Sequence, residues 1–257
     1  VLQELAEGVV LSPPGDIQTV RRILGQRDDV AAVILEPTGA SWGQIPVPES
    51  FLRELRAVTA ETDVLLIFDE VISGFRCSPG GAQAHFNITP ELTTLAKIIA
   101  GGYPGGAVVG RQDILDLLDH QAAAAQGHEK IHHPGTFNAN PVSAAAGTTA
   151  LQILAETDAC QRAIDYAGQL RESLSRVIQD EDVDWCVYGM FSGFHIYTNP
   201  DHEIVTTATI NAGRLDYRKL QAAAASEVAM KLRVSMLAHG VEIFGWPGGP
   251  TSAVHND

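Results

Sequence analysis

Two carboxylates, Asp69 and Glu70, directly follow the apolar run 64–68 (VLLIF). A carboxylate at the end of a buried strand loses hydration, which raises its pKa unless a cationic partner keeps it ionised. A protonated pyridine nitrogen is such a partner, because an ionised carboxylate beside it keeps the ring protonated and able to accept electrons from a carbanion. The dipeptide alone also allows a second interpretation, in which both residues start an exposed surface loop.

Lys97 lies between the apolar pairs 95–96 and 98–99 and is followed by the glycine-rich segment 100–106 (AGGYPGG). Apolar neighbours favour the neutral amine, and only a neutral amine forms a Schiff base with an aldehyde. The glycines would let the backbone approach a flat cofactor closely. The alternative is a lysine that extends from the end of a strand into solvent.

A third polar segment, residues 133–141 (HPGTFNANP), precedes a predicted helix. Its Gly135-Thr136 pair can offer a backbone N–H and a hydroxyl to an anion such as phosphate. The same residue types also favour ordinary turns, so this segment alone indicates little. Glu36, the fourth candidate, ends the apolar run 30–35 (VAAVIL) and is followed by Pro37.

The segments before these residues predict strands. Apolar runs at 30–35, 64–68, 92–97 and 106–110 alternate with helical spacing, as in 51–59 (FLRELRAVT). This alternation predicts an α/β fold with a mostly parallel sheet covered by helices on both faces. Functional side chains gather at the carboxyl ends of such strands. We therefore expect Glu36, Asp69 and Lys97 at one edge of the sheet.

The pattern changes near Pro141. A helix is predicted over 141–154 that continues, with breaks, through 160–178. Strands at 185–188 and 193–197, an alanine-rich helix over 217–239 and a last strand at 241–244 follow. The prediction is a large-domain portion at 1–145 and a small α+β C-terminal domain at 146–257.

Composition limits the classes of partner. The net charge of −14 opposes binding to nucleic acid and to anionic membranes. No apolar run approaches the roughly 18 residues of a membrane helix. The three cysteines, Cys77, Cys160 and Cys186, form neither a disulfide framework nor a zinc pattern, and their use is typical of the reducing cytoplasm.

Four segments together resemble one family. Residues 31–43 (AAVILEPTGASWG), 65–76 (LLIFDEVISGFR), 92–110 (LTTLAKIIAGGYPGGAVVG) and 135–147 (GTFNANPVSAAAG) are similar, in order and spacing, to segments of the class III (subgroup II) aminotransferases. The branch most similar contains glutamate-1-semialdehyde aminomutases and β-amino-acid transaminases. The resemblance implies a fold type I transferase that uses pyridoxal 5'-phosphate.

The resemblance also implies a role for three residues around the cofactor ring. Lys97 would form the Schiff base and then transfer a proton, and Asp69 would pair with the pyridine nitrogen. Val71 would pack against one face of the ring.

Three further residues match family positions at the edge of the cofactor. Ser41 would hydrogen-bond its phenolic oxygen, and Glu36 would lie nearby with a less defined role. Thr136 would reach the phosphate from a partner subunit, which implies a homodimer.

The family's N-terminal part, with its Gly-Thr/Ser-Glu-Ala phosphate turn, has no counterpart within residues 1–257. We therefore weigh three functions: a transaminase that moves an amino group from an amine or amino acid to a carbonyl acceptor, an aminomutase, and a non-catalytic dimeric remnant with weak cofactor binding. Arg76 could contact a substrate carboxylate or form a surface ion pair. A metal site on His128, His132 and His133 is the remaining alternative, against a solvated loop.

Overall fold

The computed structural model describes residues 7–256 of the 257-residue chain. Strands and helices alternate in the first part, in the order α2 (Ile17–Gln26), β1 (Ala32–Leu35), α3 (Ala40–Gly43), β2 (Ile45–Pro46), α4 (Glu49–Glu61), β3 (Leu65–Asp69), α5 (Gly81–Phe86), β4 (Leu92–Ala96), the 3₁₀ turn η1 (Lys97–Ala100) and β5 (Gly106–Gly110). The four strands predicted for this part are confirmed.

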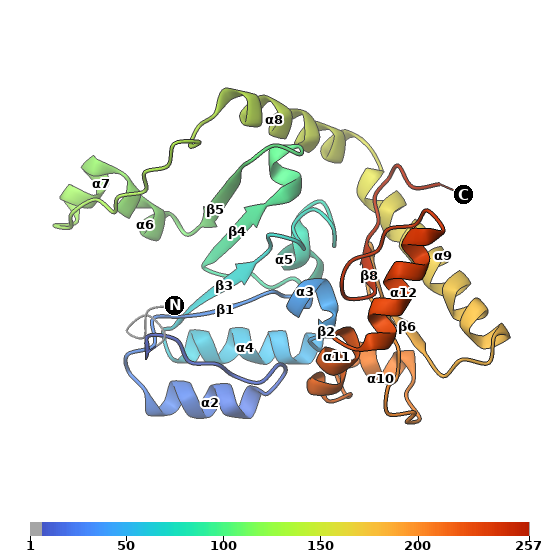
Figure 1. Ribbon diagram of the computed structural model, residues 1–257. Helices are drawn as coiled ribbons and strands as arrows, with labels where there is room; N and C mark the ends of the chain where they lie inside the picture. The colour runs from blue at the N-terminus through green and yellow to red at the C-terminus, as the bar shows by residue number, and fades with distance from the viewer. Residues whose placement is uncertain (1–6, 257) are drawn as a thin grey trace.

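Four of these strands form one sheet, in the order β1-β3-β4-β5 (Figure 1). β1, β3 and β4 run parallel, and β5 runs antiparallel to β4. The register places Asp69, the last residue of β3, beside Thr94 of β4. The carboxyl ends of the three parallel strands therefore lie at the same edge of the sheet, where the candidate residues follow.

One face of this sheet is well covered. α4 has apolar residues at helical spacing, and its Leu52 and Leu55 are fully buried in one cluster with Leu66 and Phe68 of β3. α2 adds Val20 and Leu24 to the same cluster. This cluster fixes β3, because every second residue of the strand is committed to it.

The other face is less covered by the described residues than the sequence predicts. Ile34 in β1 is 61% exposed. Val108 and Val109 in the edge strand β5 point to opposite faces and are both exposed, so the described residues leave this strand uncovered on either side. α8 (Pro141–Glu156) packs mainly on η1. The expectation of helices over both faces is therefore wrong for residues 7–256.

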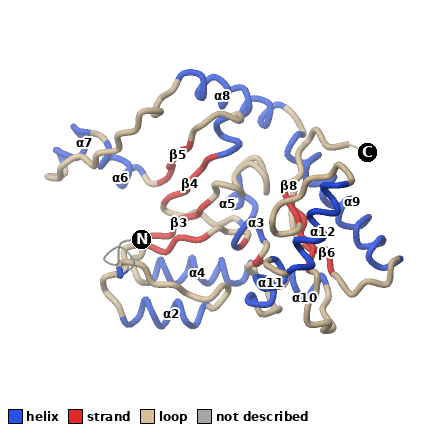
Figure 2. Tube along the Cα trace, in the orientation of Figure 1, coloured by secondary structure: helices blue, strands red, loops and turns tan. Residues whose placement is uncertain are grey.

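The second part continues with α6 (Gln112–Leu115), the 3₁₀ turn η2 (Asp116–Leu118), α7 (His120–Ala125), α8, α9 (Ala159–Asp180), β6 (Cys186–Tyr188), β7 (Gly193–Tyr197), α10 (Thr207–Asn211), α11 (Tyr217–Ala224), α12 (Glu227–Ala238) and β8 (Gly248–Pro250). β6, β7 and β8 form an antiparallel sheet in that order. Figure 2 shows its strands apart from those of the first sheet. Asn140 caps α8 by accepting the backbone N–H groups of Val142 and Ser143, at 2.9 and 3.2 Å.

The strand predicted at 241–244 is wrong. The backbone N–H of Phe244 donates instead to the carbonyl of Gly248, which closes a turn, and residues 248–250 pair with β7. The domain boundary after residue 145 falls inside α8 and stays a prediction. In residues 7–256, no helix is long and apolar enough to cross a membrane.

Candidate functional site

Lys97 is the first residue after β4 and the first of the turn η1. Its φ of 54° is unusual for a residue with a side chain, and such a residue ends a strand sharply. The side chain is exposed, and it makes no ion pair with any described residue. The expectation that apolar neighbours desolvate the amine is therefore not met in residues 7–256.

Gly101, in the segment after Lys97, and Gly147 in α8 have a packing role that the sequence does not predict. A Cβ on Gly101 would lie 2.4 Å from the carbonyl oxygen of Ala146, and a Cβ on Gly147 would lie 2.3 Å from that of Ile99. Both glycines therefore permit close contact between η1 and α8. This contact, together with the 2.8 Å bond from the Ser143 hydroxyl to the Pro104 carbonyl, fixes the turn that begins at Lys97.

Asp69 is held in place by two donors. Its Oδ1 accepts the Thr94 hydroxyl at 3.1 Å and the Val71 backbone N–H at 3.2 Å. Among the described residues, no hydrogen bond reaches its Oδ2. One carboxylate oxygen thus orients the group, and the other is available to a ligand. Sequence reasoning did not single out Thr94, although its place on the neighbouring strand follows from the register.

Glu70, next to Asp69, is separate from this site. It is 1% exposed and accepts the backbone N–H groups of Ala82 and Gln83, at 2.6 and 3.1 Å. These donors belong to the first turn of α5, where a carboxylate is favourable. The two adjacent carboxylates therefore differ in role, and the interpretation of both as the start of an exposed loop is wrong.

Glu36 shapes the chain that follows β1. Its carboxylate accepts the Thr38 hydroxyl and, at 2.9 Å, the backbone N–H of Trp42. Between these bonds the chain passes through Ser41 and Trp42, whose φ angles of 55° and 63° are both left-handed. Glu36 thereby fixes the backbone at Ser41.

Glu36 interacts electrostatically with Asp69 and Lys97. Burial raises its pKa to about 7, although the bonds from Thr38 and Trp42 act in the opposite direction. The charge of Asp69 raises this pKa further, and that of Lys97 lowers it. The structure thus brings Glu36, Asp69 and Lys97 together at the carboxyl ends of β1, β3 and β4, as the sequence predicts.

We expect Glu36→Gln to reduce the loss of stability with rising pH. The folded-state pKa of about 7 exceeds the ordinary value of 4.5, so the protonated carboxyl stabilises the fold at low pH and this contribution is lost as the pH rises towards 7. Glutamine keeps the shape without the charge. In urea unfolding, the free energy of unfolding of wild type should therefore fall between pH 5 and 8 by roughly 2–3 kcal/mol more than that of Glu36→Gln.

Glu129→Gln, at an exposed position, is the matched control and should follow wild type. Equal pH dependence in wild type and Glu36→Gln would contradict the burial of a titrating carboxyl at Glu36.

Thr136 lies apart from these three residues. It is exposed, in the segment that leads into α8. The neighbouring His133 and residues 137–140 line a groove of about 400 Å³ together with Ile99 and Pro104. In residues 7–256 no contact joins Thr136 to Asp69 or Lys97, so its predicted role on a partner's cofactor stays a prediction.

Arg76 is not in a surface ion pair. Burial lowers the pKa of its guanidinium, and its Nε has no hydrogen-bond partner in the described chain. No carboxylate among residues 7–256 pairs with it. The surface interpretation is therefore wrong, and the carboxylate-binding interpretation stays a hypothesis.

The histidine alternative finds no support. Residues 128–135 are not helical, so His128 and His132 do not share a helix face. The described chain contains no group of three or more His, Cys, Asp or Glu side chains that could hold a metal ion.

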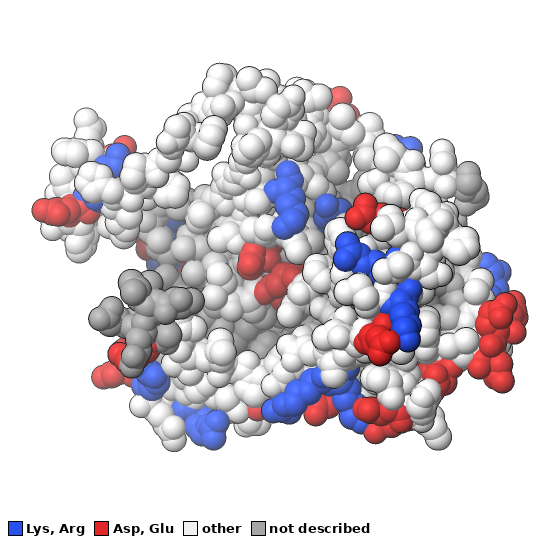
Figure 3. All heavy atoms as spheres, in the orientation of Figure 1, with Lys and Arg blue, Asp and Glu red and all other residues white. Residues whose placement is uncertain are grey.

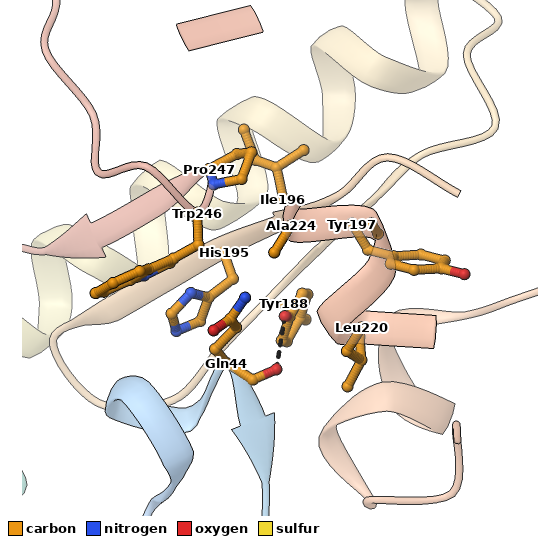
Figure 4. Close-up of a pocket in the computed structure, with 10 residues that line it drawn as sticks. Gln44, Tyr188, His195, Ile196, Tyr197, Leu220, Ala224, Trp246 and Pro247 are labelled. Carbon is orange, nitrogen blue, oxygen red and sulfur yellow. Dashed lines mark hydrogen bonds between the residues drawn. The ribbon is translucent and has the colours of Figure 1, made fainter. Parts of the chain in front are cut away.

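The face of the molecule in Figure 3 is hollowed in its middle, below α8, and acidic and basic side chains lie together there. A second, much smaller cavity, of about 10 Å³, lies between Gln44 and the β6–β7 sheet (Figure 4). Its size suits one water molecule at most, so it is no cofactor site.

Known proteins are similar to this chain in both sequence and fold. The family model for class III aminotransferases matches residues 15–215. A glutamate-1-semialdehyde 2,1-aminomutase of Methanothrix thermoacetophila is 42% identical over 197 residues, which is 77% of this chain and 44% of that protein. One of Fusobacterium nucleatum is 42% identical over 72% of this chain and 41% of its own length.

Among solved structures, an omega-transaminase from Sphaerobacter thermophilus superposes with a TM-score of 0.79 at 33% identity, over 98% of this chain and 54% of that one. A glutamate-1-semialdehyde aminomutase from Pseudomonas aeruginosa, at 22% identity and a TM-score of 0.75, shares the fold over 96% of this chain and 52% of its own. The chain thus spans about half the length of these relatives. The sequence match over residues 15–215 shows that the chain belongs to the class III aminotransferase family.

Proposed function

We propose that this chain carries the catalytic centre of a pyridoxal-phosphate-dependent transaminase. One observation carries the proposal: Asp69 ends β3, Lys97 directly follows the adjacent parallel strand β4, and Asp69 is oriented through one oxygen while the other is available. Class III aminotransferases use this cofactor, and one similar structure, 28% identical, is described as a transaminase with PLP bound.

The residues present fit the cofactor at two points. The Oδ2 of Asp69, which has no partner among the described residues, suits a pyridinium N–H. Lys97 has an exposed amine without an ion pair in the described chain, so it can reach the cofactor aldehyde. When bound, the cofactor supplies an electron sink for the carbanion formed at the substrate α carbon.

The side chains of Lys97, Asp69 and Val71 would each have a separate role in the reaction. Lys97 would hold the cofactor and would move the proton at the substrate α carbon through its Nζ. Asp69, whose carboxylate is oriented by Thr94 and Val71, would keep the ring nitrogen protonated. Val71 would also lie against one face of the ring.

Two further residues would complete the site at the end of β1. Ser41 would donate its hydroxyl to the phenolic oxygen. Glu36 holds the turn on which Ser41 sits.

We also propose that the protein acts as a homodimer in which Thr136 binds the phosphate of the partner's cofactor. Phe137, which lines the groove beside Thr136, and Val142, in the first turn of α8, are 71% and 55% exposed, as expected of an interface. Thr136→Val removes one hydroxyl donor to an anion, and we expect the cofactor Kd to rise roughly 10- to 100-fold.

Mixing two variants tests whether Thr136 acts across subunits. A heterodimer of Lys97→Ala with Thr136→Val would contain one site with both residues intact if Thr136 serves the partner, and none if it serves its own subunit. At limiting cofactor, the mixed sample should therefore regain about half of the wild-type activity per heterodimer. No gain over the separate variants would contradict the proposal.

A second function is favoured by the curated relatives, which are glutamate-1-semialdehyde 2,1-aminomutases. The two functions differ in whether the carbonyl product leaves. A transaminase releases one carbonyl compound per donor consumed and passes the amino group to a different acceptor. An aminomutase converts glutamate 1-semialdehyde, an amino aldehyde, into an isomeric amino ketone that keeps both groups, so no deaminated product is released.

Quantifying the deaminated product released from glutamate 1-semialdehyde, from β-amino acids and from simple amines, together with the isomer formed from glutamate 1-semialdehyde, separates these functions. Stoichiometric release supports the transaminase. Isomerisation without release supports the aminomutase. A protein that binds the cofactor weakly and does neither would be the non-catalytic remnant.

A further inference from the structure

The turn formed by Ser41 and Trp42 is strained. Both residues have left-handed backbone conformations, and Trp42 is a bulky residue only 4% exposed. Such conformations persist only where the surrounding structure holds them. The bonds of Glu36 hold this turn from the side of β1.

The β6–β7 sheet holds the turn from the opposite side. The Nε2 of His195, in β7, lies 2.9 Å from the carbonyl oxygen of Trp42. The indole of Trp42 lies against Gly193, where an added Cβ would come within 2.3 Å of the indole Nε1. Gln44 lies two residues after Trp42, and its carbonyl accepts the Tyr188 hydroxyl at 2.8 Å (Figure 4).

The contact fixes the tautomer of His195. A carbonyl oxygen can only accept, so Nε2 carries the hydrogen and Nδ1 does not. Nδ1 is buried without a hydrogen-bond partner in the described chain, as suits the neutral ring. His195 is 1% exposed, and burial lowers its pKa to about 4, so the ring is neutral at physiological pH.

Both backbone polar groups of Trp42 are therefore engaged, the N–H by Glu36 and the carbonyl by His195. Releasing the carbonyl would let the turn relax and would weaken the bond to Glu36. Because the charges of Asp69 and Lys97 also act on Glu36, a change at His195 would reach the cofactor site.

We propose that His195 is a positioning residue: by binding the Trp42 carbonyl it holds the Ser41 turn, and with it the Glu36 carboxyl, in the geometry that the site needs. The part that concerns the cofactor rests on the proposed function. The part that concerns Glu36 does not, and it can be tested in cofactor-free protein.

Two substitutions of similar size separate the hydrogen bond from the packing. His195→Leu removes the donor. His195→Gln places an amide N–H where Nε2 lies and keeps it. Tyr188→Phe is the matched control, because it removes a neighbouring bond from the same sheet without touching Trp42. Should His195→Leu not fold, His195→Asn replaces it, since its shorter amide does not reach the carbonyl.

The first measurement is the titration midpoint of Glu36 in cofactor-free protein, from the carboxyl ¹³C signals of glutamate-labelled samples, with Glu36→Gln to assign the resonance. The charged groups facing Glu36 are Asp69 and Lys97, and Arg171 and Tyr188 face His195. All four are unchanged in His195→Leu and His195→Gln. Losing the Trp42 bond to the ionised form should raise the midpoint in His195→Leu by about one pH unit.

The second measurement is the Kd for pyridoxal phosphate, which we expect to rise about tenfold in His195→Leu and to stay near wild type in His195→Gln and Tyr188→Phe. A folded His195→Leu with the wild-type Glu36 midpoint would overturn the proposal. If wild type does not bind the cofactor but His195→Leu still shifts the midpoint, the proposed function fails and the positioning of Glu36 stands.

Discussion

Replacing Lys97 with alanine is expected to abolish the covalent attachment of pyridoxal phosphate and to lower turnover by at least about 10⁴-fold. In the proposed function one side chain supplies both the bond to the cofactor and the proton transfer, so both would be lost together. Stability should change little, because Lys97 is exposed, has no ion-pair partner in the described chain and has a φ that alanine tolerates no worse than lysine. Absorbance spectra, steady-state rates and thermal melts measure the three effects.

Lys130→Ala, at an exposed position in the segment before α8, is the control and should match wild type. Adding a small primary amine to Lys97→Ala should restore part of the rate, because a soluble amine can transfer the proton without being attached. If Lys97→Ala turned over at the wild-type rate, Lys97 would not be the residue that performs this chemistry.

Replacing Asp69 with alanine is expected to leave the covalent attachment at Lys97 intact and to lower turnover by about 10³-fold. In the proposed function the carboxylate stabilises the protonated ring nitrogen, and without it the electron sink would be lost. Asp69→Asn should behave similarly, because the amide keeps the hydrogen bonds from Thr94 and Val71 but carries no charge. Single-turnover rates with an amine donor measure the effect without interference from product release.

Thr94→Val should lower turnover less than Asp69→Ala does. It removes one of the two donors that orient Asp69 but keeps the charge, so the expected loss is about tenfold. A wild-type rate in Asp69→Ala would show that the ring nitrogen does not face β3.

The sequence predicted well those features that depend on local pattern. Continuous apolar runs mark β1, β3, β4 and β5, and the helical spacing in 51–59 marks α4. The carboxyl ends of parallel strands bring Glu36, Asp69 and Lys97 together, which follows from strand direction alone. The break between α8 and α9 was also predicted.

Features that depend on distant partners were not predictable in the same way. Glu70 is adjacent to Asp69, yet its role comes from the N-terminus of α5, eleven residues further on. The exposure of Lys97 depends on what surrounds η1, not on its sequence neighbours. The apolar stretch 241–244 resembles a strand, but the turn closed by Phe244 and Gly248 leaves pairing with β7 to residues 248–250.

The two left-handed residues at Ser41 and Trp42 had no signal in the sequence, because glycine or asparagine usually marks such positions. They are stabilised from both sides by Glu36 and by His195, which is 153 residues from Trp42 along the chain. Only the tertiary structure connects these two anchors.

The decisive experiment is to incubate wild type with pyridoxal phosphate, remove the excess by gel filtration, reduce with borohydride and map the modified peptide by mass. We expect a visible absorbance band that shifts on reduction, with the added mass on Lys97. A colourless protein, or a cofactor mass on any other lysine, would contradict the assignment of Lys97 as the residue that holds the cofactor.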